Sequence, residues 1–364
     1  MIKVLHIING EYYSGAERVQ DLLSLNLERY GYEVLFACLK LDKFIDYCKT
    51  DKSKVFDFTM KNKYDFFRVK EISQFVTRRN IQIIHTHTPR SSVIGYPVSV
   101  LQKLPLVHHV HSPTIRDTEK IITNIINTKV ENYVIDKATK VITVSNSLVN
   151  YLSSYKKDMS NVSVIHNGVP SAPNNTYSIS KNKKLNIGSV ALFRERKGLE
   201  ILLSALKIIK SRGYEFLFHA LGSFVSEEYK IKIKAVIQEL GLEHNVVLHG
   251  FVKDIYIQLK DLDIFVLPSL YGEGLPMVVL EAMATGVPVV ASNVEGVVEA
   301  IPDSTYGLLV EPNNAELLAE SIIELLENSS MRNAISVAAY NRQISELSDS
   351  SMAYSVAELY KDLH

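Results

Sequence analysis

The feature that most constrains the fold is an alternation that runs along the whole chain. Short apolar runs rich in β-branched residues are separated by longer amphipathic stretches. Apolar runs of about four to eight residues favour strands that are buried on both faces, and amphipathic stretches favour the helices that cover them. The pattern therefore predicts an α/β fold built on parallel sheets, with helices as the crossover connections.

Six strands are expected in each half of the chain. In the first half they span residues 3–8, 33–39, 81–86, 106–111, 140–144 and 162–166, and in the second half residues 185–190, 215–221, 246–249, 264–267, 287–291 and 307–310. Expected helices include residues 16–30, 66–79 and 118–136. Two such series predict two doubly wound, Rossmann-like domains, which bind ligands at the carboxyl ends of their strands and face one another across a cleft.

The domain boundary is expected at residues 170–184. This segment is rich in Pro, Ser, Asn and Lys and has no hydrophobic period, which is typical of a linker. A chain of 364 residues also suits two domains of about 100–200 residues each. We expect an N-terminal domain over residues 1–170 and a C-terminal domain over residues 171–347.

Charge restricts the class of partner. The chain has 40 Lys and Arg and 40 Asp and Glu, so it is not built mainly to bind nucleic acid. Residues 1–180 nevertheless carry 23 basic and 16 acidic side chains, whereas residues 181–364 carry 17 and 24. The basic half suits an anionic acceptor or peripheral contact with an anionic membrane, although surface lysines can also be merely solubilising. Residues 61–68, which mix basic and aromatic side chains, are the candidate contact.

Two absences in the sequence bear on the cellular location. The chain has two cysteines, Cys38 and Cys48, which is too few for a disulfide framework and lacks zinc-site spacing. It also has no stretch of about 20 apolar residues that could span a membrane. We expect a cytoplasmic protein, with any membrane contact peripheral at the inner face of the cell membrane.

A strand, a Gly-rich loop and a helix follow one another over residues 267–281. The helix is expected to begin near Leu275 with Pro276 in its first turn. The amides of Leu275, Met277 and Val278, at the positive end of the helix dipole, would then bind a diphosphate. Glu273 and Glu281 are separated by a helical rise of roughly 9 Å, which suits two ends of one nucleotide-sugar. A loop charge and a surface carboxylate are the alternative interpretation.

A cluster of cations follows the first strand of the second half. Residues 187–198 end in a loop that contains Arg194, Arg196 and Lys197. Cations fixed beside a leaving diphosphate stabilise the transition state more than the ground state. A solvated loop is the alternative.

Loops of the first half offer acceptor-side groups. Gly10 and Gly15 permit close backbone approach and an anion at the next helix. His111 ends a strand, where it projects from the carboxyl end of the sheet. Alternate residues of a strand face opposite sides, so His109 shares a face with His111 and His108 does not.

Metal binding is expected to be absent. The strand before His111 supplies two ligands at most, and His85 and His87 raise the same question. For Asp261 and Asp263, the family resemblance described below implies an ordinary surface turn.

The segment around Glu273 resembles the retaining glycosyltransferases of family 4, which have the two-domain GT-B fold. Their motif of two glutamates separated by seven residues matches Glu273 and Glu281, and the match continues through residues 282–290. The resemblance implies that Glu273 binds hydroxyls of the donor sugar and that Glu281 binds the ribose. Lys197 matches the phosphate-binding lysine. Leu192 departs from the pattern where many members have arginine, and Arg194 is the candidate to supply that charge.

The resemblance extends over nearly the whole chain. Val252, in the segment 249–254, matches backbone that meets the nucleobase. Residues 14–17 resemble a Gly-Gly-x-Glu loop beside the donor phosphates and the acceptor, with Ser14 in place of one glycine. His111 matches a histidine near the reacting sugar. As in other GT-B enzymes, the final stretch, about residues 348–364, is expected to pack back on the first domain.

Together these matches imply a metal-independent retaining glycosyltransferase without a cofactor. It would move a sugar from a nucleoside-diphosphate-sugar, most simply a UDP-sugar, to a hydroxyl of a glycan or lipid-linked acceptor in bacterial-type cell-surface polysaccharide or glycolipid synthesis. The catalytic candidates are His111, Lys197, Arg194 and Glu273. The donor-binding candidates are Gly15, Arg196, Val252, Gly274, Leu275, Pro276, Met277 and Glu281, and the acceptor-side candidates are Gly10, Ser14 and Glu17.

Two alternative functions remain open. One is a nucleotide-sugar isomerase or hydrolase of the 2-epimerase type, which would consume donor without an acceptor. The other is a non-catalytic subunit that binds a nucleotide-sugar, which Leu192 favours. A dehydrogenase is disfavoured because no Gly-x-Gly-x-x-Gly follows the first strand of either half.

Overall fold

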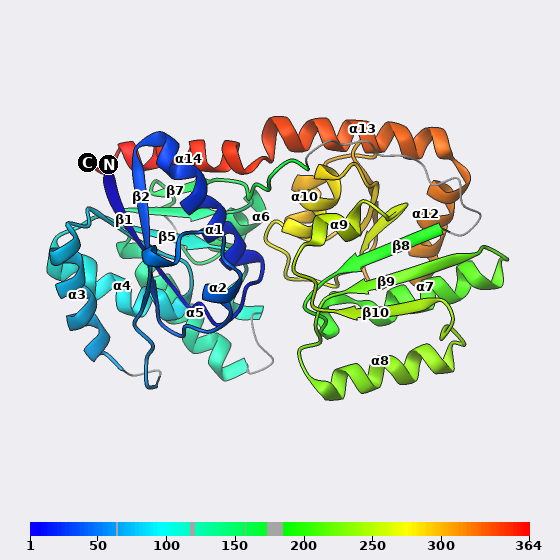
Figure 1. Ribbon diagram of the computed structural model, residues 1–364, viewed down its shortest axis with the longest axis horizontal. Coiled ribbons are helices and arrows are strands. Elements are labelled where there is room, and N and C mark those ends of the chain that lie inside the picture. Colours follow the sequence, from blue (N-terminus) through cyan, green and yellow to red (C-terminus); the bar gives the residue numbers. More distant parts are fainter. Residues whose placement is uncertain (63–64, 117–120, 157, 173–184) are drawn as a thin grey trace. The chain divides into compact units, whose positions relative to one another are not determined.

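The computed structural model describes residues 1–62, 65–116, 121–156, 158–172 and 185–364 (Figure 1). The chain forms two compact units. Unit 1 comprises Met1–Gly168 and Asp349–His364, and unit 2 comprises Val169–Ser348. Most of the expected linker, residues 173–184, lies outside the described residues.

Unit 1 is built on a parallel sheet of seven strands in the order β3-β2-β1-β4-β5-β6-β7. The central strands are buried on both faces, as their continuous apolar runs require. The strands are β1 (Ile2–Ile8), β2 (Tyr32–Cys38), β3 (Val55–Asp57), β4 (Ile83–Thr86), β5 (Leu106–Val110), β6 (Lys140–Thr143) and β7 (Val162–Val164).

Seven α-helices belong to the described part of unit 1. They are α1 (Gly15–Leu27), α2 (Lys43–Tyr47), α3 (Phe67–Arg79), α4 (Pro89–Gln102), α5 (Ile121–Lys137), α6 (Asn146–Ser153) and α14 (Asp349–Lys361). Although α14 follows unit 2 in the sequence, it packs against α1. The side-chain amide of Asn26 donates to Asp349 at 3.1 Å across this contact. The last helix therefore completes unit 1.

Unit 2 repeats the plan with six parallel strands in the order β10-β9-β8-β11-β12-β13. The strands are β8 (Leu185–Val190), β9 (Phe216–Leu221), β10 (Val246–Gly250), β11 (Ile264–Leu267), β12 (Val289–Ser292) and β13 (Leu308–Val310). Its helices are α7 (Leu199–Ser211), α8 (Glu227–Glu239), α9 (Ile255–Leu259), α10 (Met277–Ala284), α11 (Val297–Ala300), α12 (Ala315–Glu327) and α13 (Ser329–Glu346).

All twelve expected strands are present, and the doubly wound α/β fold is confirmed for each unit. The strand order reverses between β1 and β4 in unit 1 and between β8 and β11 in unit 2. Such a reversal opens a crevice at the carboxyl ends of the two neighbouring strands, where open α/β sheets bind ligands. These two positions are where functional residues are expected.

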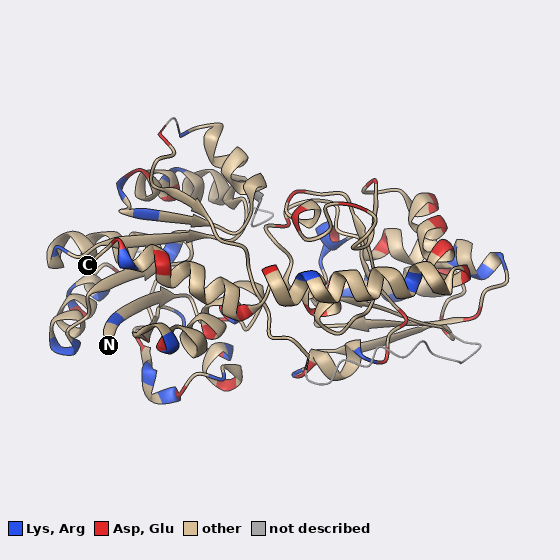
Figure 2. Ribbon diagram, turned by 90° about the horizontal axis from the view of Figure 1, so that it is seen from above, with Lys and Arg blue, Asp and Glu red and all other residues tan. Residues whose placement is uncertain are grey.

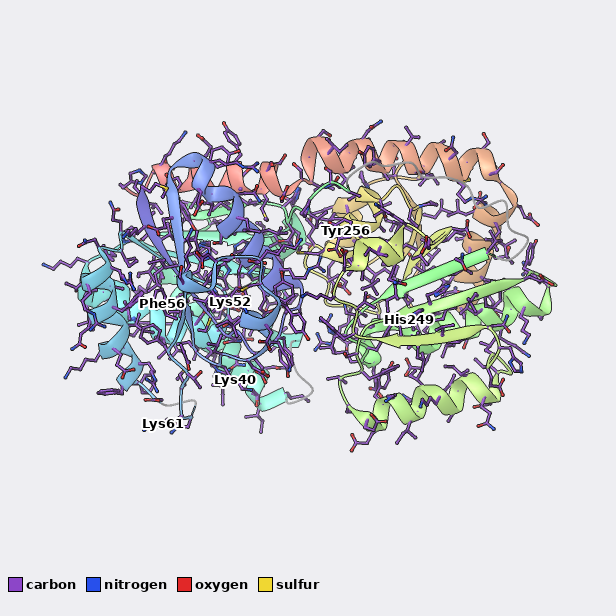
Figure 3. The ribbon with its side chains drawn as sticks, viewed as in Figure 1. Lys40, Lys52, Phe56, Lys61, His249 and Tyr256 are labelled. Atoms are coloured by element: carbon purple, nitrogen blue, oxygen red, sulfur yellow. The ribbon has the colours of Figure 1, made fainter. Side chains whose placement is uncertain are left out.

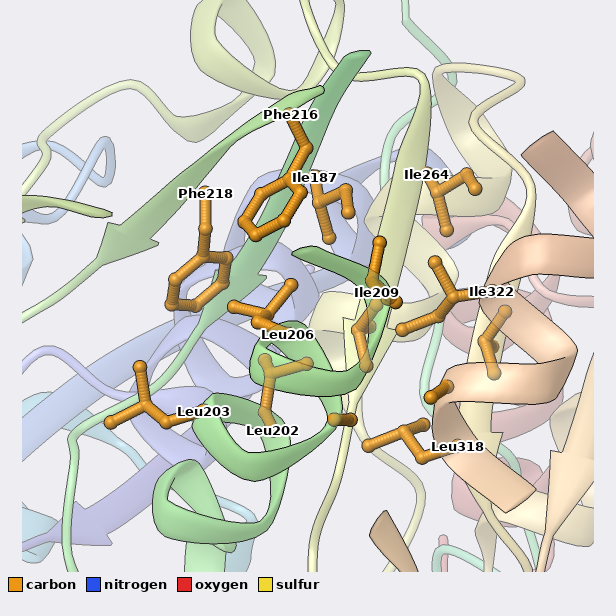
Figure 4. Packing of buried hydrophobic residues seen from close by; sticks show 14 of the residues in the cluster. Ile187, Leu202, Leu203, Leu206, Ile209, Phe216, Phe218, Ile264, Leu318 and Ile322 are labelled. Atoms are coloured by element: carbon orange, nitrogen blue, oxygen red, sulfur yellow. The ribbon is translucent and has the colours of Figure 1, made fainter. Parts of the chain in front are cut away.

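The core of unit 2 lies between the sheet and its covering helices (Figure 4). Ile187 and Ile264 on the sheet face Leu206 and Ile209 of α7 and Ile322 of α12. Burial of each such side chain stabilises the fold by about 1.5–3 kcal/mol. Helix α10 is buried over nearly its whole surface, which explains why its sequence is apolar on every side.

The start of α10 differs from the expectation. The helix begins at Met277, and Pro276 is its N-cap, with φ −72° and the extended ψ of 112°. The expected start near Leu275, with Pro276 in the first turn, is therefore wrong. A proline disfavours helical backbone at the residue before it, so Leu275 stays in the loop.

None of the helices in the described ranges is long and apolar enough to cross a membrane. Basic and acidic residues both occur on several elements of each unit (Figure 2).

Candidate functional site

Two loops of unit 2 converge where the strand order reverses. Strands β8 and β11 are neighbours in the sheet. The loop after β8 carries Arg194 and, in a 3₁₀ turn (Glu195–Lys197), Arg196 and Lys197. The loop after β11 carries Glu273 and leads into α10. The Leu270 amide donates to the Arg196 carbonyl at 2.8 Å, which joins the two loops directly.

An ion pair between Lys197 and Glu273 lies at the centre of this site. Ser269 also donates its hydroxyl to the Glu273 carboxylate, at 2.5 Å. Burial lowers the pKa of Lys197, and the nearby arginines act in the same direction against the Glu273 charge. Burial alone would raise the pKa of Glu273, but Lys197, Arg196 and the Ser269 hydrogen bond outweigh it, so the pKa lies below its usual value. The Glu273 carboxyl is therefore ionised at neutral pH.

Several polar contacts fix the Gly-rich loop. Arg196 donates to the carbonyls of Tyr271 and Gly272, at 3.2 and 2.9 Å. The Glu295 carboxylate accepts from the Gly272 amide at 2.8 Å and from the Glu273 amide at 3.4 Å. Arg196, expected to bind donor, thus braces the loop. Ser269 and Glu295 were not among the site residues predicted from the sequence.

A close backbone contact explains one glycine of the loop region. The Gly296 amide donates to the Glu273 carbonyl at 3.1 Å. A Cβ at Gly296 would lie 1.3 Å from the Gly274 carbonyl oxygen, so no larger residue fits without moving the loop. Packing against α11 therefore holds Glu273 beside Lys197.

The start of α10 offers backbone donors. Within the described residues, the amides of Met277 and Val278 have no hydrogen-bond partner, as the first turn of a helix requires. Two amides at the positive end of a helix favour an anion. Leu275, Pro276 and Gly274 form the buried approach to this turn. Glu281 lies in the second turn and is fully buried.

Two further positions of unit 2 were considered in the sequence, Val252 and Asp263. Val252 follows β10 and is half-buried. Asp263 is not in a surface turn as expected, because it is 2% exposed and its carboxylate accepts from the Asn186 amide at 2.8 Å. That contact fixes the start of β8, and buried carboxylates require such a donor.

In unit 1, the loop after β1 is held by its own side chains. Gly10 has φ +82°, a conformation that favours glycine, and is buried against Cys38. Ser14 caps α1, and its hydroxyl donates to the Glu17 carboxylate at 2.7 Å. Burial raises the pKa of Glu17. Gly15 begins α1 at the surface, where a Cβ would contact nothing. Glu17 therefore supports the loop in this structure.

Five histidines gather at the carboxyl ends of β1, β4 and β5. They share one side of the sheet and have ring centroids 4.3–5.5 Å apart in several pairs, and they are His6, His85, His87, His109 and His111. The expectation that His109 and His111 share a face is confirmed. His108 points the other way, where Thr86 lies 2.8 Å and Glu131 3.2 Å from its ring nitrogens.

All five clustered histidines are neutral at pH 7. Burial lowers the pKa of His6 and of His111 to about 3. Burial, followed by repulsion from neighbouring imidazoles, also lowers the pKa values of His85, His87 and His109 well below the usual range.

The sequence matches two glycosyltransferase families over most of its length. Residues 13–172 match the family described as Glycosyltransferase Family 4, and residues 176–342 match the family described as glycosyl transferases group 1. An uncharacterised glycosyltransferase of Methanocaldococcus jannaschii is 30% identical over 304 residues, covering 77% of this chain and 75% of that protein.

Two further relatives are enterobacterial. A putative colanic acid biosynthesis glycosyltransferase of Salmonella typhimurium is 31% identical over 183 residues, covering 45% of this chain and 44% of that protein, so the match spans less than half its length. The Escherichia coli UDP-Gal:alpha-D-GlcNAc-diphosphoundecaprenol alpha-1,3-galactosyltransferase is 22% identical, covering 100% of this chain and 97% of that protein.

Solved structures share the fold. Anabaena Alr3699/HepE in complex with UDP and glucose has a TM-score of 0.88 and 21% identity, with both chains covered completely. A glycosyltransferase from Rickettsia africae has a TM-score of 0.82 and 22% identity, covering 100% of this chain and 98% of its own.

Proposed function

The chain belongs to glycosyltransferase family 4, and on that basis we propose that it transfers a sugar from a UDP-sugar to an acceptor hydroxyl with retention at the anomeric carbon. The observation that carries the proposal is the buried Lys197–Glu273 ion pair beside the amino end of α10. The ion pair supplies one cation and one carboxylate at the ligand-binding edge of the sheet, and the start of α10 adds two backbone donors.

The proposed roles follow from charge. Lys197, Arg194 and the amides of Met277 and Val278 hold the diphosphate of the donor, while Glu273 accepts hydrogen bonds from hydroxyls of the sugar. Glu281 holds the ribose, and the backbone at Val252 meets the base.

The reaction proceeds on one face of the sugar. The bond between the anomeric carbon and the diphosphate oxygen breaks, and the acceptor oxygen forms its bond from the same side. The departing diphosphate takes the acceptor proton, so no protein base is needed. Negative charge grows on the diphosphate in this step, and fixed cations lower the barrier because they bind that charge most strongly in the transition state. We propose that these side chains make a metal ion and any other cofactor unnecessary.

The choice of substrates rests on the relatives. The Anabaena neighbour is solved with UDP, and the Escherichia coli relative is named for transfer from UDP-Gal to a lipid-diphosphate-linked sugar. We propose the same classes here, a UDP-sugar donor and a glycan or lipid-linked acceptor in cell-surface polysaccharide or glycolipid synthesis.

The first experiment measures release of nucleoside diphosphate from UDP-, GDP- and ADP-sugars, with and without a lipid and glycan extract and with EDTA throughout. We expect release from a UDP-sugar that depends on the extract. Glu281→Gln should raise the KM for the UDP-sugar by at least tenfold, because the buried carboxylate loses its charge. Glu324→Gln, an exposed carboxylate on α12, is the control and should change nothing.

Three results would contradict the proposal. Donor consumption without extract indicates an isomerase or hydrolase of the 2-epimerase type. Donor binding without turnover under all conditions indicates a binding subunit. Activity that requires a divalent cation overturns the metal-independent mechanism.

A peripheral membrane contact through unit 1 is proposed for the lipid-linked acceptor. Phe66 and Phe67, at the start of α3, are 53% and 60% exposed, and Ile122 of α5 is 75% exposed. Lys52 and Lys61 add positive charge to this unit, whereas Lys40 is paired with Glu11 (Figure 3). Exposed aromatic and aliphatic side chains insert at a membrane surface, and each nearby cation adds about 1 kcal/mol on an anionic one. Of the segment 61–68, residues 63–64 lie outside the described residues.

Vesicle sedimentation tests this contact. We expect binding to vesicles that contain phosphatidylglycerol, little binding to pure phosphatidylcholine, and at least a threefold loss of binding in Phe66→Ser/Phe67→Ser. Val337→Ser, an exposed apolar residue of α13 in unit 2, is the matched control. Equal binding of both variants would contradict a contact through α3.

A further inference from the structure

A tight turn with an unusual residue connects β12 to α11. The turn is closed by the Val297 amide, which donates to the Val294 carbonyl at 2.9 Å. Its two central residues are Glu295, with φ +20°, and Gly296, with φ −74° and ψ −4°. A positive φ followed by a negative φ is the pattern of a type II′ turn, in which glycine dominates the first central position. In this chain a glutamate occupies that position.

The backbone of Glu295 is strained. Within the described residues, three other non-glycine residues have a positive φ, namely Asn80, Lys103 and Asn313, and their values of 55–60° lie in the ordinary left-handed region. Glu295 lies outside that region, in a part of φ space that a side chain disfavours. Strain of this kind persists only where the surrounding structure imposes it, and it is typical of functional sites. The turn alone therefore does not explain why this residue is a glutamate.

The side chain of Glu295 binds the Gly-rich loop. Its carboxylate accepts from the amides of Gly272 and Glu273, at 2.8 and 3.4 Å. Arg196 donates to the carbonyls of the same two peptide groups, those of Tyr271 and Gly272, at 3.2 and 2.9 Å. Both polar ends of two successive planar peptide groups are therefore bound, and rotation of either group would break two hydrogen bonds.

The peptide group that follows Glu273 is held as well. The Gly296 amide donates to the Glu273 carbonyl at 3.1 Å. The turn thus fixes the backbone on both sides of Glu273, and with it the direction in which the side chain leaves. Lys197 and Ser269 both contact Oε1 of the Glu273 carboxylate, whereas Oε2 has no hydrogen-bond partner in the described part of the chain. Oε2 is the oxygen that remains for a ligand.

We propose that Glu295 is a positioning residue for Glu273 and that it thereby determines which donor sugar is accepted. This inference rests on the proposed function, in which Glu273 accepts hydrogen bonds from hydroxyls of the sugar. A hydrogen bond weakens steeply as its angle closes, so an acceptor oxygen with a fixed direction distinguishes hydroxyls of opposite configuration. The strained backbone is retained because the Glu295 carboxylate imposes that direction.

Two variants separate the strain from the positioning. Glu295→Gly and Glu295→Ala both remove the carboxylate, but only glycine adopts the positive φ without strain. We expect the midpoint of thermal unfolding of the glycine variant to lie about 2–4 °C above that of the alanine variant. The positioning of Glu273 should be lost equally in both. Equal midpoints would contradict the strain at this position, and a lower turnover in the less stable variant would indicate a merely structural role.

Hydrogen exchange measures the positioning without any substrate. In both variants the amides of Gly272 and Glu273 lose their acceptor, so mass spectrometry of a peptide that contains them should show two protons that exchange about tenfold faster or more. Glu295→Gln keeps an acceptor oxygen at the same place and should exchange like the wild type. Asn313→Gly, which changes another residue of positive φ at an exposed position of unit 2, is the matched control. Unchanged exchange in Glu295→Gly would overturn the role of Glu295.

Donor discrimination is the second readout. The preferred UDP-sugar is compared with the epimer that differs from it in one hydroxyl, as UDP-glucose differs from UDP-galactose, and the ratio of their kcat/KM values is measured by release of UDP. We expect this ratio to fall by about threefold or more in Glu295→Gly and Glu295→Ala, and to persist in Glu295→Gln and Asn313→Gly.

The two readouts have separate failures. An equal loss of kcat/KM for both epimers, or a wild type that does not distinguish them, would overturn the role of Glu295 in donor choice. A wild type that releases UDP from none of the donors would instead contradict the proposed function. Because hydrogen exchange needs no donor, it still decides in that case whether Glu295 positions Glu273.

Discussion

Lys197→Ala is expected to lower kcat by about 100- to 1,000-fold, with little change in the affinity for acceptor. A fixed donor aimed at charge that develops in the transition state contributes about this much to a rate. Lys197 is held in place by Glu273 and by its own burial. In the variant, water therefore cannot take the place of the ammonium group without moving the Gly-rich loop. The loss should therefore appear in kcat, measured as release of nucleoside diphosphate under saturating donor.

Two comparisons separate chemistry from folding. Lys232→Ala removes an exposed lysine that pairs with Glu195 and Glu200 on unit 2, at 3.1 Å each, and should leave kcat unchanged. Lys197→Ala also leaves the Glu273 carboxylate buried without its cation, so the double variant Lys197→Ala/Glu273→Gln restores the neutral balance. We expect it to regain thermal stability but not turnover. Wild-type kcat in Lys197→Ala would contradict the assignment.

Acidification from pH 7 to about pH 5 is expected to unfold unit 1. Burial lowers the pKa values of all five clustered histidines, whereas in the unfolded chain they titrate near 6.5. Their contribution to stability is therefore fully present above pH 6.5 and is lost as the pH falls below it, because the unfolded chain then binds more protons. At about 1.4 kcal/mol per proton for each pH unit below the unfolded pKa of about 6.5, five protons cost about 10 kcal/mol by pH 5. A domain is stable by only about 5–15 kcal/mol.

Circular dichroism and tyrosine fluorescence along a pH series measure this transition. Tyrosine fluorescence can be used because the chain has no tryptophan. Glu17, whose pKa burial raises, offsets at most one of the five protons. His109→Phe should reduce the proton uptake by one, because within the described residues the His109 ring nitrogens have no hydrogen-bond partner and the ring only stacks. His249→Gln, on the edge strand β10 of unit 2 (Figure 3), is the control. A transition at pH 5 with uptake of fewer than two protons would contradict the buried neutral cluster.

Features set by local sequence were predictable. Mainly apolar runs identified every central strand, because a strand buried on both faces has few positions that face water. The loops that carry Lys197 and Glu273 were also expected at the site, since they directly follow strands. By contrast, β3 was missed. It has three residues at the edge of its sheet and passes from buried to exposed, so it has no apolar run to detect.

Features set by distant contacts were not predictable. The Tyr360 hydroxyl lies 3.2 Å from His6 Nε2 although the two residues are 354 positions apart, and nothing near either residue indicates the other. Glu295 accepts from the Gly272 amide although it follows 23 residues later in the sequence, after α10, so its role appears only once that helix is packed. The start of α10 depends on the backbone restriction that a proline imposes on the residue before it, which shifted the first turn to Met277.

The position of α14 has a consequence for biosynthesis. Residues 1–168 leave the ribosome first, but the helix that completes their unit follows about 180 further residues, all of unit 2. At about 5–20 residues per second, the first sheet waits roughly 10–40 s for Tyr360 while the histidine cluster lacks its cover. Unit 2 is continuous in sequence and can fold as soon as it emerges. Nascent chains should therefore acquire their tertiary structure in the reverse of their order of synthesis.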